Sequence, residues 1–158
     1  MNTWEMDSIT SVPKLLASVS QFLPEAHTVS FEIHKACPEA VKVYAKHHSS
    51  EKFRPQRDTI APRTQLHYCI ISKSLADDLD GILGRHKIRD VFWHVKGFGD
   101  RKMLFAIHDA DLGDAVYLSG HIESKVVRAI GSAIGREPTR LQTGYDWDEN
   151  QLKNESSS

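Results

Sequence analysis

The sequence has few cysteines and no long apolar run. Its two cysteines, Cys37 and Cys69, are far apart and lack the paired spacing of a zinc or thioredoxin-type site. Both lie beside apolar segments, so we expect two free, buried thiols in a reducing compartment. No apolar stretch approaches the ~20 residues that a bilayer-spanning helix needs, which excludes a transmembrane segment.

An excess of charge of one sign is also absent. The chain has 20 Lys and Arg residues against 21 Asp and Glu residues, a formal net charge of -1 at pH 7. This balance disfavours nucleic acid as a partner, and it provides no net positive charge for binding an anionic membrane. No apolar segment of the kind found in secretory signals follows the first residues, so we expect a cytoplasmic protein.

Common catalytic motifs are missing. The sequence has no Walker-type phosphate loop, no Gly-x-Ser-x-Gly turn and no His-Glu-x-x-His zinc motif. Gly97-Phe98-Gly99 falls in a predicted hairpin rather than between a strand and a helix, so it is no dinucleotide-binding signature. We therefore assign no catalytic residue, no cofactor and no metal site. The sequence does not decide whether the chain is an enzyme, and it favours a protein that is not one.

Histidine is abundant, with nine residues, but spacing argues against a shared metal centre. His94 and His108 are predicted on adjacent strands. A two-residue hairpin loop would place them on opposite faces of the sheet, and a three-residue loop would leave them about four residues out of register. At ~3.3 Å per residue, that offset is roughly 13 Å, too far for one ion.

Hydrophobic periodicity predicts a single α+β domain, as a chain of 158 residues favours. Apolar residues recur at helical spacing in four segments, residues 12–23, 38–47, 75–83 and 122–134. Strand-like patterns occupy five segments, residues 27–34, 65–71, 91–96, 102–108 and 115–119.

The resulting order is αβαβαβββα. It predicts a five-stranded mixed, mainly antiparallel sheet with about four covering helices. The domain is expected to span residues 1–136, and residues 137–158 to form a C-terminal extension whose last residues are disordered.

Local signals mark where the predicted elements begin and end. Ser11 is expected to cap the first helix and Gly135 to end the last. Ser74 with Asp77 resembles a capping box at the start of the third helix. Residues 97–100, Gly-Phe-Gly-Asp, are expected to form the hairpin turn between two strands.

Residues 48–64 lack any periodicity and are long for a structureless loop. They contain Arg54, Arg57 and Arg63, whose planar guanidinium groups suit carboxylate or phosphate recognition. The segment is therefore either a binding loop or an arm packed on its own domain, and the sequence favours neither.

A second candidate lies near the C-terminus. Tyr145, Asp146, Trp147, Asp148 and Glu149 combine large aromatic rings with acids, outside any periodic element. Such a segment is typical of an interface anchor. A simpler interpretation is that Trp147 docks on its own domain while the acids face water. We favour this interpretation over a partner site by about two to one.

The best polar cluster is formed by His108, Asp109, Asp111 and Asp114, which follow one predicted strand. His108 could act as a base oriented by an aspartate. We favour instead a polar turn whose aspartates bond their own backbone.

These features favour a non-catalytic protein that recognises one macromolecular partner, in its most concrete form an immunity- or antitoxin-type inhibitor of a toxic enzyme. The alternative is a small enzyme in which Arg54, Arg57 and Arg63 hold an anionic substrate and His67 or His108 moves a proton. The enzyme requires a concave pocket that joins an arginine to a histidine, whereas the inhibitor can use an exposed surface. The sequence identifies neither the partner nor the oligomeric state.

Overall fold

The computed structural model describes residues 2–7, 11–51, 63–100, 102–144 and 147. Its four α-helices are α1 (Val12–Phe22), α2 (Pro38–Lys46), α3 (Lys73–Leu83) and α4 (Ser124–Ile134). Its seven strands are β1 (Thr3–Met6), β2 (Thr28–Ile33), β3 (Gln65–Ile70), β4 (His94–Gly99), β5 (Lys102–Ile107), β6 (Val116–Ser119) and β7 (Thr139–Leu141). Among these residues, no helix is long and apolar enough to cross a bilayer.

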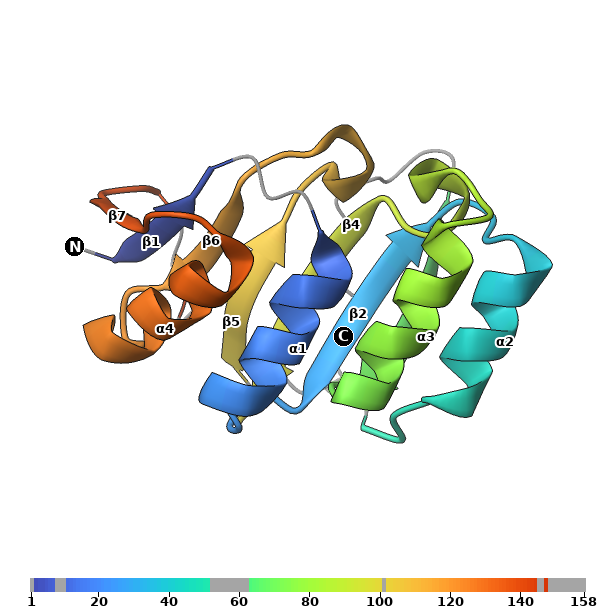
Figure 1. The fold of residues 1–158 in the computed structure, drawn as a ribbon, viewed down its shortest axis with the longest axis horizontal. Coiled ribbons are helices and arrows are strands. Elements are labelled where there is room, and N and C mark those ends of the chain that lie inside the picture. The colour runs from blue at the N-terminus through green and yellow to red at the C-terminus, as the bar shows by residue number, and fades with distance from the viewer. Residues whose placement is uncertain (1, 8–10, 52–62, 101, 145–146, 148–158) are drawn as a thin grey trace.

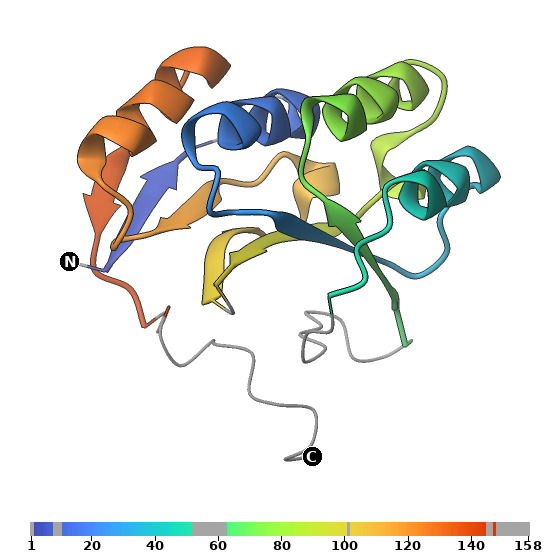
Figure 2. The ribbon, with the colours of Figure 1, turned by 90° about the horizontal axis from the view of Figure 1, so that it is seen from below.

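The strands form one sheet in the order β3-β2-β4-β5-β6-β1-β7, and all neighbouring strands are antiparallel. Figure 1 shows the four helices side by side across the sheet. In the view turned by 90°, all of them lie on the same side (Figure 2). The fold therefore has two layers, with one sheet face covered by helices and one face free of them.

The predicted α+β class and four helices are confirmed, but the prediction of five strands in a mixed sheet is wrong. The missed strands are β1, with four residues, and β7, with three. Neither is long enough to show an alternating pattern, and both owe their conformation to pairing: β1 lies between β6 and β7. β7 falls within the segment described above as an extension, so that segment supplies the last strand.

The predicted turn at residues 97–100 is also wrong, because Gly97 and Gly99 lie inside β4. A Cβ on Gly97 would come within 1.9 Å of the Phe105 ring, and one on Gly99 within 1.8 Å of the Glu25 carbonyl oxygen. These glycines serve close approach of neighbouring groups rather than chain reversal. The residue with turn geometry is Asp100, at φ 49°.

The helix boundaries follow local capping chemistry. Ser11 caps α1 as predicted, since its side chain accepts a hydrogen bond from the Lys14 amide. The expected cap at Ser74 is wrong: Ser72 accepts the bond from the Leu75 amide at 3.0 Å, and α3 begins at Lys73. Gly135 ends α4 in the left-handed region, as expected, at φ 74°.

The main hydrophobic core lies between the helices and the sheet. Phe31 on β2 stacks on Tyr44 of α2, with ring centroids 4.8 Å apart. Cys69 is fully buried in the same region, and burial raises the pKa of its thiol to about 12. Both cysteines are free, and Cys37 is partly buried.

Charged side chains join α2 to α3 at the outer surface. The Asp78 carboxylate lies 2.8 Å from the Lys46 ammonium and 2.6 Å from the His47 Nε2 atom. These contacts fix the C-terminal end of α2 against the middle of α3. Hydrogen bonds from Lys46 and then His47 hold the pKa of Asp78 below its ordinary value.

A second bridge joins the start of α2 to the end of α3, and it makes stability depend on pH. Arg85 and then His86 hydrogen-bond Glu39 and lower its pKa to about 2 from 4.5. The folded state therefore binds the Glu39 proton more weakly than the unfolded chain does. The stabilisation is complete above pH 4.5 and is lost as the pH falls toward 2.

We therefore expect Glu39→Gln to lower the melting temperature at neutral pH, with a difference from wild type that shrinks between pH 4.5 and 2. Thermal melts followed by circular dichroism across that range measure it. Asp80→Asn is the matched control, since Asp80 is exposed and makes no ion pair with the described residues. A constant difference between Glu39→Gln and wild type at all pH values would contradict the bridge.

The tight contact at Gly99 gives a second prediction. Gly99→Ala would force a methyl group against the Glu25 carbonyl, a backbone atom that cannot move aside by a change of rotamer. We expect a loss of about 1–3 kcal/mol in the free energy of unfolding, measured by urea denaturation. Gly144→Ala is the control, since its added Cβ meets no atom within 4 Å, and equal effects at the two positions would contradict the strand placement.

Candidate functional site

The sheet face without helices carries its own ordered side chains. Because strand residues alternate between faces, the neighbours of core residues Phe31 and Val95 point to the other side. A second hydrophobic cluster lies there, made of Phe98, Met103, Ala106 and Trp147, with Tyr68 and Tyr117 packed against it.

Trp147 completes this cluster from a position far along the chain. Its ring is 3% exposed, and its Nε1 atom donates a hydrogen bond to Thr3 Oγ1 at 3.0 Å. Nearby, the Asn2 side chain donates to the Thr143 carbonyl at 2.9 Å and accepts from the Thr143 amide. Thr143 and Trp147 are thereby bonded to Asn2 and Thr3 at the start of β1, which is the arrangement that the docking interpretation of Trp147 predicts.

Polar side chains are also buried on this face, on the neighbouring strands β2 and β4. Glu32 on β2 is 2% exposed, and His94 and Lys96 on β4 are 6% and 5% exposed. The Thr64 hydroxyl donates to Glu32 at 3.0 Å. Buried Lys and Glu side chains are rare in proteins unless they are paired, so this row is a defining feature of the face. We call Glu32, His94 and Lys96 the buried polar row.

His94 ends the row and contacts the turn that follows β5. Its Nδ1 atom accepts a hydrogen bond from the Asp109 amide at 2.9 Å, so the neutral ring carries its proton on Nε2. Asp109 adopts the left-handed conformation, at φ 52°, and its carboxylate is 3.8 Å from the same ring nitrogen. The turn is thus held by an interaction that the sequence did not reveal.

The predicted geometry of His94 and His108 is wrong, because a β-bulge changes the register. Gly99 pairs with Lys102 and Phe98 with Met103, but beyond the bulge Gly97 pairs with Phe105 and Val95 with Ile107. Continuing this register places His94 opposite His108, on the same face of the sheet. The described residues nevertheless contain no group of three or more His, Cys, Asp or Glu side chains able to hold a metal ion.

Two groups at this end of the sheet have shifted acidities. Burial, and then the charge of Glu5, raises the pKa of the Tyr117 phenol. Burial is also the main cause of the raised pKa of Asp111. His108 lies close by, with its ring centroid 6.5 Å from that of Tyr117. Tyr117, Asp111 and His108 thus form a polar corner beside the turn that follows β5.

The sequence-predicted binding residues are only partly described. Arg54, Arg57, Tyr145, Asp146, Asp148 and Glu149 lie outside the described residues. Arg63 is exposed and directly precedes Thr64, which bonds Glu32. The buried polar row itself was missed, because the alternation of Thr28, Ser30 and Glu32 with apolar neighbours is typical of a strand whose polar side faces water.

The two histidines of the alternative enzyme hypothesis do not meet. His67 on β3 stacks against Tyr44 of α2 at 4.8 Å, so it lies on the helix-covered face, where burial lowers its pKa. His108 packs beside Tyr117 on the opposite face. They are therefore two separate candidates for the proton-transferring base, and a substrate bound on one face could reach only one of them.

No protein-family model matches the chain, and no curated protein or solved structure resembles it at a significant level.

The docking of Trp147 gives a testable prediction. Trp147→Ala should lower the free energy of unfolding by about 3–5 kcal/mol, because a large buried ring is removed. Trp147→Phe keeps most of the ring and loses the bond to Thr3, so it should cost about 1 kcal/mol. Urea denaturation followed by far-UV circular dichroism compares the two variants, and a negligible effect of Trp147→Ala would show that the ring is not docked in solution.

Proposed function

We propose that this chain is a non-catalytic cytoplasmic binding protein that recognises one protein partner, with an immunity- or antitoxin-type inhibitor as the concrete form. The partner would be an enzyme with a basic active site, which the acids at positions 146, 148 and 149 cover. They take the place of a polyanionic substrate.

The observation that supports this proposal is the burial of Trp147 on the helix-free face. The ring is occupied by its own domain, so contact with a partner falls to the acids beside it in the sequence. Asp146 and Asp148 are covalent neighbours of a fixed residue. Fixing a segment before binding reduces the entropy that is lost on association.

The enzyme hypothesis has less support. It needs one histidine, either His67 or His108, next to the arginines that hold the anion, and Arg63 makes no hydrogen bond with either ring in the described part of the chain. Arg63, the one described arginine of the predicted loop, is exposed.

The test begins with the tagged full chain in native lysate, followed by mass spectrometry and sizing of the captured complex. The identified partner is then titrated calorimetrically with wild type and with the triple variant Asp146→Ala, Asp148→Ala, Glu149→Ala. We expect at least about tenfold weaker binding by the variant, equivalent to about 1.4 kcal/mol, and inhibition of the partner by wild type.

A matched triple variant, Glu25→Ala, Glu123→Ala and Glu137→Ala, removes three exposed acids elsewhere on the chain and should bind normally. If both triple variants lost the same affinity for the partner, the loss would be explained by the change in net charge rather than by the positions of the acids. Full affinity without the acids at positions 146, 148 and 149, or a chain that captures no stoichiometric partner, would refute the proposal.

A further inference from the structure

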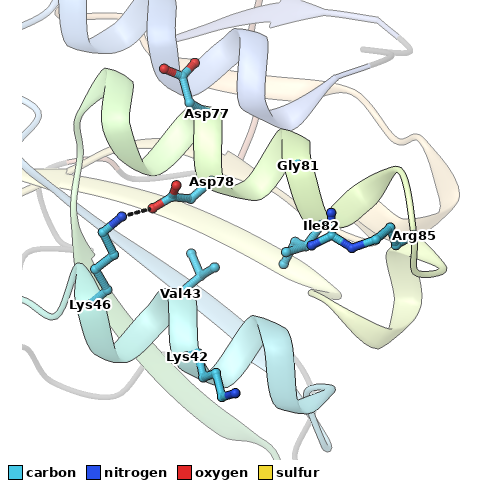
Figure 3. A pocket seen from close by; sticks show the side chains of 8 residues that line it. All are labelled: Lys42, Val43, Lys46, Asp77, Asp78, Gly81, Ile82 and Arg85. Atoms are coloured by element: carbon cyan, nitrogen blue, oxygen red, sulfur yellow. Dashed lines mark hydrogen bonds and ion pairs between the residues drawn. The ribbon is translucent and has the colours of Figure 1, made fainter.

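A groove of about 340 Å³ lies between α2 and α3, on the outer surface of the helix layer. Its floor is apolar and is formed by Val43 of α2 and Ile82 of α3, which point toward each other in Figure 3. The bridges described above hold the two helices together, with Lys46 and Asp78 at one end and Arg85 at the other. The groove therefore lies between two helices that are joined by side-chain contacts at both of its ends.

Gly81 leaves one side of this groove without a side chain. It lies inside α3, where glycine is less favourable than alanine by about 1 kcal/mol. A Cβ at this position would meet no atom within 4 Å, so packing gives no reason for its absence. What the glycine does provide is bare helix backbone that a neighbouring chain can approach closely.

The charges around the groove are unequally satisfied. Asp78 is bonded by Lys46, and Asp77 by Lys73 at 2.8 Å, so both carboxylates have cationic partners. Lys42, by contrast, makes no hydrogen bond or ion pair with the described residues. The side chains of Lys46 and Arg85 remain 62% and 60% exposed despite their ion pairs. The groove thus offers cations to a ligand and no uncompensated anion.

We propose that this groove binds a segment of a protein partner in which an aliphatic or aromatic side chain is flanked by carboxylates. The apolar side chain would lie on Val43 and Ile82, against the backbone of Gly81. A carboxylate of the segment would meet the Lys42 ammonium. This interaction is independent of the acidic C-terminal segment, since the groove lies on the helix layer and Trp147 packs on the other face of the sheet.

The probe is a fluorescein-labelled helical peptide of about 14 residues, with leucines four positions apart and glutamates around them. A matched peptide carries lysine at every glutamate position. Fluorescence polarisation with the full chain at physiological salt measures both affinities. We expect the glutamate peptide to bind at least about tenfold more tightly than the lysine peptide.

Three variants locate the binding. Gly81→Leu fills the groove and Lys42→Glu reverses its free charge, and each should weaken binding of the glutamate peptide at least about tenfold. Ala133→Leu adds the same aliphatic side chain to an exposed position on α4 and should leave the affinity unchanged. Gly81→Ala should raise the melting temperature by roughly 2–4 °C, which checks that the position tolerates a side chain.

The proposal fails if neither peptide binds, if the two bind equally, or if Ala133→Leu weakens binding as much as Gly81→Leu. It also fails if wild type dimerises in analytical ultracentrifugation and Gly81→Leu abolishes the dimer, because a second copy would then fill the groove. None of these outcomes depends on the acids at positions 146, 148 and 149, so the test is separate from that of the proposed function.

Discussion

All four helices pack on one face of the sheet, so the side chains that are buried on the other face are covered without a second helix layer. Part of this burial comes from residues far apart in the sequence, where Thr3 on β1 accepts the hydrogen bond from Trp147. The ring closes a cluster with Phe98, Met103 and Ala106, side chains that would otherwise be exposed to water. β1 pairs with both β6 and β7, so Thr3 on β1 and the residues that follow β7 lie at the same side of the sheet.

Sequence patterns predicted the helices well because their periodicity is local. Each helix carries an apolar stripe, and a single residue type predicts each of two helix ends, Ser11 at the start of α1 and Gly135 at the end of α4. They did not predict β1 and β7, which are too short to carry a pattern and form by pairing with strands far away in the sequence. Gly97 and Gly99 were misassigned for a related reason: their role is close approach to Phe105 and to the Glu25 carbonyl, which only the folded chain creates.

The candidate site was harder to predict than the fold. That Trp147 docks could be argued from one large ring outside any periodic element, but its partner Thr3 could not. The register of His94 depends on a bulge that leaves no sequence signal here. The buried polar row escaped detection for a further reason: polar residues on alternate strand positions normally face water, and Glu32 and Lys96 are buried.

Burial of that row also limits what the helix-free face can do. Side chains that are 2–6% exposed cannot touch a partner directly, and the desolvation of Glu32 and Lys96 is compensated only while their interactions persist. The contacts of this row join Glu32 on β2 to Thr64 and His94 on β4 to the turn at Asp109. In the proposed binding role, recognition would use groups that stay exposed at the margins of the fold, such as Lys42 on α2. Under that proposal the helices packed on the sheet position such groups, and the specificity of binding would reside in the groups themselves.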